Sequence, residues 1–119
     1  MTKGQTEAKI SEAISKFEIE YMGRGPKQIK TLIVQDIIVI RLIRFLSHSE
    51  QKMATSPNGV ELMKKVRLML FENAITYLEE LIKNIIDIDI ISIHSDVSTR
   101  TGEKIIVITA DENIERRFE

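Results

Sequence analysis

The stretch IISIHSDVSTRTGEKIIVIT, residues 90–109, reads as a β-hairpin and decides the fold. Two runs rich in β-branched residues flank a short loop that contains Gly102, which is the usual sequence signal for a hairpin. The polar groups of residues 94–96 and 98–101 lead into that loop. The hairpin therefore combines sheet-forming strands with the densest cluster of polar side chains in the chain.

Residues 28–34 and 37–45 form a second pair of aliphatic runs, and Gln35-Asp36 is the most polar point between them. A two-residue turn at this point predicts the pairs Val34 with Ile37, Leu32 with Val39 and Lys30 with Arg41. Both faces of this second hairpin are then largely apolar. The like-charged pair requires a nearby acid such as Glu20, a bound anion or a different register.

Helical periodicity marks the segments between and before the hairpins. Residues 6–22 carry an apolar stripe that consists of Ile10, Ala13, Ile14, Phe17 and Tyr21. Most of the charged residues point in other directions; this group consists of Lys9, Glu12, Lys16, Glu18 and Glu20. Glycine and proline in residues 23–26 end this helix, because glycine is favoured just past a helix C-terminus and proline cannot continue the helix. Ser47 and Glu50 match a capping box and predict a short helix through Ala54.

A long helix is predicted from Pro57, capped by Ser56, to about Asn84. Its apolar stripe consists of Val60, Met63, Val66, Leu70, Ala74, Tyr77, Leu78, Leu81 and Ile85. At 1.5 Å per residue this helix is about 40 Å long, whereas a strand of six to eight residues covers only about 20–26 Å. Part of it should therefore extend beyond the sheet.

These elements predict one α+β domain over residues 1–119, a two-layer sandwich in which a mostly antiparallel four-stranded sheet carries a long and a shorter amphipathic helix on one face. Strands that are apolar on both sides are normally covered on both sides. Burial of the second face against another copy of the chain would be favoured by about 25 cal/mol per Å² of apolar surface, before the entropic costs of association. We therefore expect a homodimer.

Composition narrows the functional classes. Lys and Arg (17) nearly balance Asp and Glu (18), so the net charge of −1 gives no general attraction to nucleic acid or anionic lipid. The basic cluster of Lys64, Lys65 and Arg67, with Arg41 and Arg44, is more typical of a solvated face, which makes nucleic-acid binding unlikely. Cysteine is absent, which removes disulfides, thiolate nucleophiles and Cys-ligated zinc. Without an apolar leader or a span of ~20 apolar residues, a cytoplasmic location away from the membrane is expected.

Ser92, His94 and Asp96 alternate along one strand and point to one face, which superficially suggests a catalytic triad. Residues two apart on a strand lie about 6.6–6.8 Å apart, too far for the hydrogen bonds of about 2.6–3.2 Å that proton transfer needs. No catalytic residue is therefore assigned. His94 and Asp96, with Glu103 across the hairpin, are also a weak metal signature, so we predict neither metal nor cofactor. Asp96, Ser98, Thr99 and Thr101-Gly102 can equally well shape the turn.

Residues 23–27, Gly-Arg-Gly-Pro-Lys, allow a different interpretation, because glycines let backbone N–H groups approach an anion and Arg24 can bind one bidentately. A helix-ending turn explains the same glycines. If this turn meets the polar end of the last hairpin, a ligand-binding pocket results. Its residues would be Arg24, His94, Asp96, Thr99, Thr101 and Glu103.

Three motifs together resemble the YbcI-like family of small bacterial proteins, a domain of unknown function, over nearly the whole chain. They are residues 3–8 (Lys-Gly-Gln-Thr-Glu-Ala), residues 21–26 (Tyr-Met-Gly-Arg-Gly-Pro), and residues 97–103 after the His-Ser-Asp of 94–96. Ser95 and Val97 depart mildly from the Thr and Ile of the family. The resemblance implies that the Gly-Arg-Gly-Pro turn and the His-x-Asp hairpin matter, and it implies no activity, cofactor or partner.

The sequence is thus expected to encode a non-enzymatic, homodimeric cytoplasmic protein that binds a small ligand or a protein partner in a regulatory or stress role. One alternative is a small enzyme or anion-binding protein with its site around Arg24 and His94/Asp96. The other is a weak nucleic-acid binder.

Overall fold

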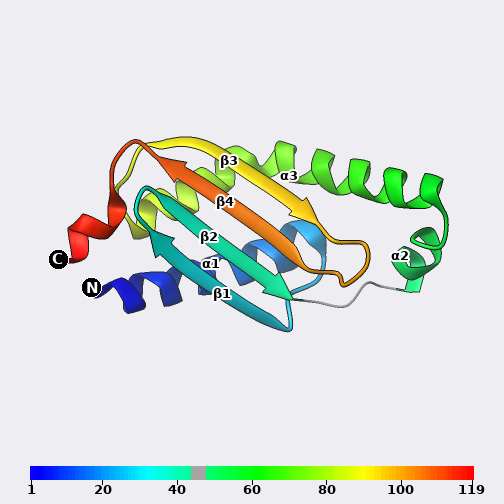
Figure 1. Ribbon diagram of the computed structural model, residues 1–119, viewed down its shortest axis with the longest axis horizontal. Coiled ribbons are helices and arrows are strands. Elements are labelled where there is room, and N and C mark those ends of the chain that lie inside the picture. Colours follow the sequence, from blue (N-terminus) through cyan, green and yellow to red (C-terminus); the bar gives the residue numbers. More distant parts are fainter. Residues whose placement is uncertain (44–47) are drawn as a thin grey trace.

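A computed structural model of the chain describes residues 1–43 and 48–119 (Figure 1). The elements, in order, are α1 (Lys3–Met22), β1 (Gln28–Val34), β2 (Ile37–Ile43), α2 (His48–Met53), α3 (Pro57–Ile85), β3 (Ile90–Val97), β4 (Lys104–Ala110) and the 3-10 helix η1 (Ile114–Phe118). The α+β class and the two hairpins are confirmed. The predicted capping residue Ser47, the last residues of the predicted second strand and Arg44 lie outside the described residues.

The four strands form one antiparallel sheet in the order β1-β2-β4-β3. The predicted register of the β1–β2 hairpin is confirmed at all three of its pairs, Val34 with Ile37, Leu32 with Val39 and Lys30 with Arg41. Strands β2 and β4 join the hairpins in the centre, while β1 and β3 are the edges. Successive side chains of each strand point to opposite sides of the sheet, so the sheet has two distinct faces.

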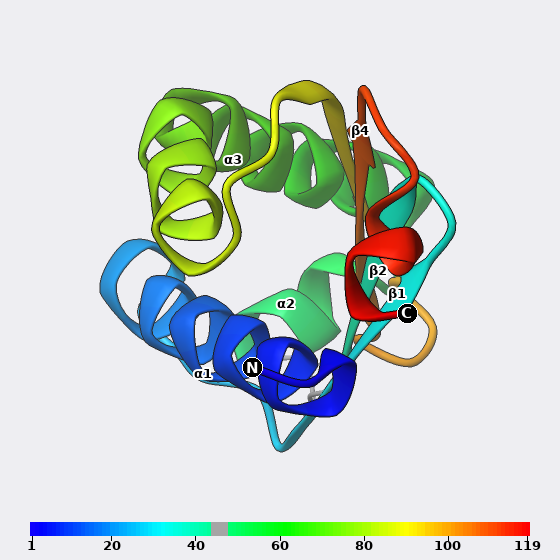
Figure 2. The ribbon, with the colours of Figure 1, turned by 90° about the vertical axis from the view of Figure 1, so that its left-hand side faces the viewer.

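Helices α1 and α3 lie side by side on one face of this sheet and leave the other open (Figure 2). Helix α1 begins at a capping box between Thr2 and Gln5 and ends at Gly23, whose φ of 77° is left-handed. The buried core lies between the helices and the sheet. Its largest fully buried side chains are Phe17, Ile10, Ile14, Ile33, Ile38, Ile40, Leu42, Leu78, Ile82, Ile88, Ile106 and Ile108.

Two details of the helical prediction are wrong. Helix α3 buries Met63, Phe71, Ala74, Leu78 and Ile82. Three members of its predicted stripe, Val66, Leu70 and Tyr77, are exposed instead. A helix with many apolar residues offers more than one stripe, and the sheet contacts determine which one is buried. Glu18 is likewise fully buried on α1, although its charge placed it outside the stripe.

The long helix extends beyond the strands, as its length predicts (Figure 1). Twenty-nine residues rise about 44 Å, against about 23 Å for a seven-residue strand. Helix α2 packs on the projecting part of α3, where Arg67 forms an ion pair with Glu50. The projecting part also carries exposed apolar side chains, among them Leu62 and Met69.

The C-terminal η1 is attached to the turn between β1 and β2. The carboxylate of Glu115 accepts hydrogen bonds from the backbone N–H of Gln35 (2.6 Å) and from the ammonium of Lys3 (3.0 Å). These two donors, the backbone N–H first, hold the pKa of Glu115 below its usual range. Gln35 itself has a left-handed φ of 55°, so this carboxylate supports a turn that is unfavourable for glutamine.

We expect the Glu115 contribution to stability to disappear in acid. A carboxyl whose pKa is lower in the folded chain stabilises the fold above its ordinary pKa, and the effect is lost as the pH falls through the folded pKa. The stability difference between the wild type and Glu115→Gln in urea unfolding should therefore be larger at pH ~7 than at pH ~3. An equal difference at both values would contradict this assignment.

Candidate functional site: the open face of the sheet

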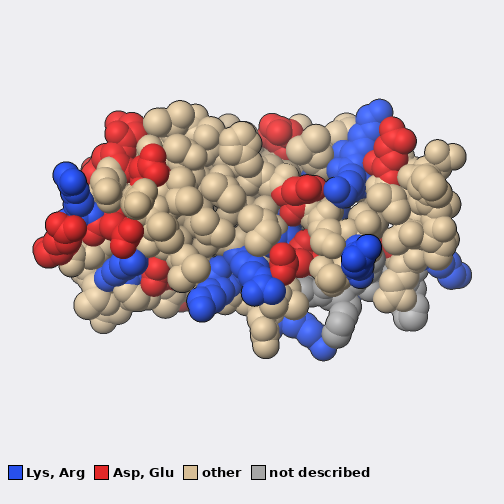
Figure 3. All heavy atoms as spheres, viewed as in Figure 1, with Lys and Arg blue, Asp and Glu red and all other residues tan. Residues whose placement is uncertain are grey.

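The face of the sheet opposite the helices carries a field of apolar side chains. It is formed by Leu32 and Val34 of β1, Ile37 and Val39 of β2, and Ile105 and Val107 of β4. Leu32 and Val34 remain 44% and 43% exposed, and the other four are half-buried. Figure 3 views this face directly and shows an uncharged field left of centre, bounded by charged groups on its left, below it and on its right. We call these six residues the open face.

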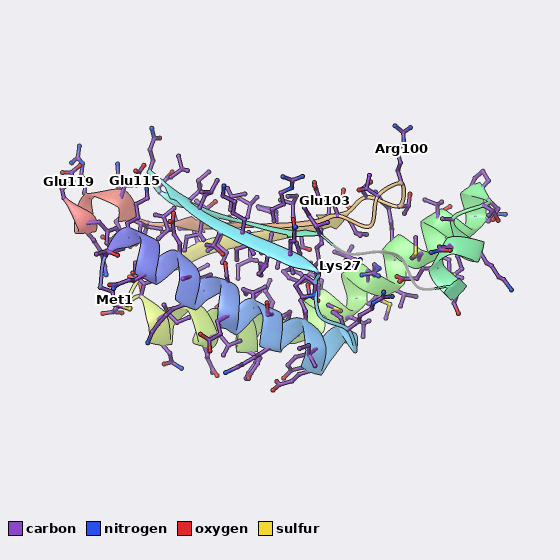
Figure 4. The ribbon with its side chains drawn as sticks, turned by 90° about the horizontal axis from the view of Figure 1, so that it is seen from below. Met1, Lys27, Arg100, Glu103, Glu115 and Glu119 are labelled. Atoms are coloured by element: carbon purple, nitrogen blue, oxygen red, sulfur yellow. The ribbon has the colours of Figure 1, made fainter. Side chains whose placement is uncertain are left out.

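Side chains project from this face away from the helices, as the view along the sheet shows (Figure 4). Cross-strand pairing arranges them in rows. The middle row consists of Leu32, Val39, Val107 and His94, and the row toward the β1–β2 turn consists of Val34, Ile37, Thr109 and Ser92. Apolar side chains on β1 and β2 thus give way to polar ones on β3.

The third row is charged and reads Lys30, Arg41, Ile105 and Asp96 from β1 to β3. The like-charged neighbours Lys30 and Arg41 do pair, so the register is not the explanation for this pair. Of the three alternatives, a nearby acid is the one that the structure contains, and this acid is Glu103 rather than the example Glu20. The Glu103 carboxylate lies 2.8 Å from the Nε of Arg41. The row therefore runs from basic on β1 and β2 to acidic on β3.

The polar end of the last hairpin shapes its own turn. The carboxylate of Asp96 accepts the Val97 N–H at 2.8 Å, and the hydroxyl of Ser98 accepts the N–H groups of Arg100 and Thr101. Thr101 in turn accepts the N–H of Glu103 at 3.2 Å. Gly102 adopts a left-handed φ of 78°. The turn-forming interpretation of these side chains is thereby confirmed for Asp96, Ser98 and Thr101.

A cleft of about 350 Å³ lies where the projecting part of α3 passes the β3–β4 end of the sheet. Its lining residues are Glu61, Lys64, Lys65, Arg67, Leu68, Phe71, Ser95, Asp96, Val97 and Lys104. Phe71 and Lys104 are its most deeply buried members, and the Lys104 ammonium lies 5.2 Å from the centre of the Phe71 ring. That ammonium also lies 2.8 Å from the carboxylate of Glu18. The cleft thus has an apolar floor with a buried cation.

The six predicted ligand residues are distributed over this end of the molecule. Arg24 is exposed in the loop before β1, whereas His94 is exposed on β3, the opposite edge strand. Asp96 lines the cleft and lies 3.4 Å from the Lys64 ammonium. Thr99, Thr101 and Glu103 lie in the β3–β4 loop. The cleft unites Asp96 with the basic cluster of α3 rather than with Arg24, and a common pocket for all six stays a prediction.

Sequence reasoning did not find the pair of Glu18 and Lys104. Nothing in the local pattern distinguishes them from solvated charges, because they come from α1 and β4 and meet only through tertiary packing. One signal was present. Every second residue of β4 points to the same side of the sheet, so Lys104 shares a face with Ile106, Ile108 and Ala110. This shared face predicts that the Lys104 side chain is buried.

Within residues 1–43 and 48–119, no three His, Asp or Glu side chains are grouped so that they could hold a metal ion. No helix in that part of the chain has both the length and the apolar character needed to cross a membrane.

Comparison with known proteins yields two relatives in Bacillus subtilis (strain 168). The uncharacterized protein YbcI is 34% identical over 99% of this chain and 95% of its own length. The uncharacterized protein YrhF is 26% identical over 92% of this chain and 91% of its length. No solved structure matches the chain significantly. The family model for MpsC, described as a Na⁺-translocating membrane potential-generating system, matches residues 2–112. The resemblance to YbcI is therefore confirmed, and the chain belongs to the MpsC family.

Proposed function

We propose that the chain is a non-enzymatic, cytoplasmic binding protein that works as a homodimer and serves as a component of a Na⁺-translocating membrane system. The open face carries this proposal. An apolar field that spans the centre of a four-stranded sheet is a typical association surface, because apolar side chains gain most when a partner removes them from water. The place in a Na⁺-translocating system is taken from the family description alone.

A binding role also agrees with the chemistry of the last hairpin. Ser92, His94 and Asp96 pair with Thr109, Val107 and Ile105 and so stand in parallel on one strand. The Asp96 carboxylate is occupied by Val97 and Lys64. These neighbours support a structural role for the acid rather than the orientation of His94 as a base.

Val107→Lys tests this proposal. The wild type is expected to sediment as a dimer at ~10 μM. The variant should be monomeric, with a dissociation constant raised at least ~100-fold, because an ammonium would be buried at the centre of the interface. Sedimentation velocity measures both species. Circular dichroism should show unchanged secondary structure, since Val107 alternates with the buried residues of β4 and so lies on the open side of the sheet.

Leu62→Lys is the matched control, because Leu62 is an exposed apolar residue (55%) on the projecting part of α3. It introduces the same charge and should leave the dimer intact. A wild type that stays monomeric at this concentration would refute the proposal. Loss of the dimer with Leu62→Lys but not with Val107→Lys would refute the open face as its interface.

A further inference from the structure

We propose that two copies pack their open faces together about a two-fold axis parallel to the strands, so that Lys30 lies over Asp96 of the partner subunit. This inference rests on the proposed homodimer and specifies its geometry. The partner that covers the open face is a second copy of the chain. The supporting features are the order of charges across the sheet and the size of the face.

The order of charges favours this axis. In a face-to-face pair, rotation about an axis along the strands exchanges left and right across the sheet, so β1 lies over β3 of the partner subunit and β2 over its β4. The charged row then places Lys30 over Asp96 of the partner subunit, and Arg41 over Ile105 of the partner subunit. Each dimer contains two such oppositely charged contacts, because the interface is symmetric.

The charge of Lys30 adds to this argument. Arg41 has Glu103 at 2.8 Å, whereas the described residues provide no ion-pair partner for the exposed Lys30 beside it. Like charges directly opposite each other on neighbouring strands are unfavourable. A second acid above the row would compensate Lys30, and the long side chain of lysine can reach across a sheet-to-sheet spacing of about 10 Å. Asp96 of the partner subunit, 78% exposed in this chain, supplies that acid. Its Oδ1 already accepts the Val97 N–H and lies 3.4 Å from the Lys64 ammonium of its own chain, so Lys30 would bind through Oδ2, for which the described residues provide no partner.

The alternative axis in the plane of the interface runs perpendicular to the strands. It would place β1 over β1 and reverse the rows, so that the charged row would face the row of Val34 and Ile37 in the partner. Lys30 and Arg41 would then lose water without gaining an acid, which is costly. The middle row, which is apolar except for His94, faces the middle row of the partner under either axis, so the charged row discriminates between the two axes.

The size of the face sets the expected strength. Four strands at ~4.8 Å spacing and about 23 Å in length give a face of about 20 by 23 Å. This is about 460 Å² of projected area, below the ~800 Å² per partner of a standard-size interface and in the range of weak, transient contacts. We therefore expect a reversible dimer with a dissociation constant in the micromolar range, so that a single charge contact is measurable.

Charge reversal at Lys30 tests the axis. Lys30→Glu should weaken dimerisation at least ~10-fold at low salt, because it places two acids over each other. Adding Asp96→Lys in the same chain should restore the dissociation constant to within ~3-fold of the wild type. Lys9→Glu is the matched control, since it makes the same charge change on the exposed side of α1 and should have no effect. Sedimentation velocity at two salt concentrations measures all four proteins.

Crosslinking gives a second, independent measurement, because the chain contains no cysteine. Under the proposed axis, a mixture of Leu32→Cys and His94→Cys chains should yield a heterodimer with a short bis-maleimide reagent. Leu32→Cys alone should not crosslink, because the two β1 strands lie three strand spacings apart, about 14 Å, across the interface.

The outcomes separate this inference from the proposed function. If Leu32→Cys crosslinks with itself, or if Lys30→Glu leaves the dimer unchanged while Val107→Lys dissociates it, the proposed axis is overturned and the open-face dimer stands. Failure of Asp96→Lys to rescue Lys30→Glu also overturns the axis. If Val107→Lys does not dissociate the dimer, both proposals fail together.

Discussion

Replacing Lys104 with methionine is expected to lower the free energy of unfolding by about 3–5 kcal/mol, because it removes the counter-ion of a buried carboxylate. The ammonium of Lys104 lies 2.8 Å from Glu18, and the two side chains are only 5% and 0% exposed. Their elements, β4 and α1, belong to different layers of the fold. Removal of the lysine therefore leaves a desolvated charge between the sheet and the helices. Urea unfolding at one fixed protein concentration measures the change.

The double variant Glu18→Leu/Lys104→Met is the informative control. Replacement of both charges by apolar side chains of similar volume removes the desolvation penalty together with the attraction, so its stability should return to within about 1 kcal/mol of the wild type. Glu18→Leu alone should be destabilising in the same way as Lys104→Met. A double variant as unstable as the sum of the two single ones would show that the two charges are not coupled.

Leu78→Ala should lower the free energy of unfolding by about 2–5 kcal/mol, because the lost methyl groups leave a cavity as well as lost burial. Leu78 is fully buried on α3, where it belongs to the core that α3 shares with α1 and the sheet. Thermal and urea unfolding measure the loss. The effect should be almost entirely on stability, since Leu78 lies on the helical side of the sheet, away from the open face.

The same helix offers a matched control in Leu62. It is 55% exposed, so Leu62→Ala removes the same atoms without opening a cavity and should change stability by no more than about 0.5 kcal/mol. A loss at Leu62 comparable to that at Leu78 would mean that the projecting part of α3 is covered in solution. The dimer would then involve α3 as well as the open face.

Local sequence signals were sufficient for the elements of this fold. The glycine at 23 and Ser56 end and begin helices where capping chemistry predicts, and the two-residue turn at Gln35-Asp36 produces the predicted register. These features depend on residues within a few positions of each other. The alternation of β1 and β2 likewise predicts that both faces of the sheet are apolar, which is a property of period-two strands and requires no partner.

Local sequence signals did not predict the contacts around the site. That the acid beside Arg41 is Glu103 rather than Glu20 follows from the pairing of β2 with β4, which joins the two hairpins. The strand order also places Arg24 and His94 near opposite edges of the sheet. Neither result can be read from a hairpin considered alone, because strand order is decided by packing between segments far apart in the chain.

The sequence by itself determined the two hairpins, the helices before and between them and the existence of a second apolar sheet face, because caps, turns and alternation act over a few residues. It did not determine the start of α1 at Lys3 or the 3-10 helix η1. The tertiary structure decided which stripe of α3 is buried, why Glu18 tolerates burial, and which end of the charged row is acidic. Each of these depends on contacts between residues far apart in sequence, whose charges and shapes are compatible only once the sheet has brought them together.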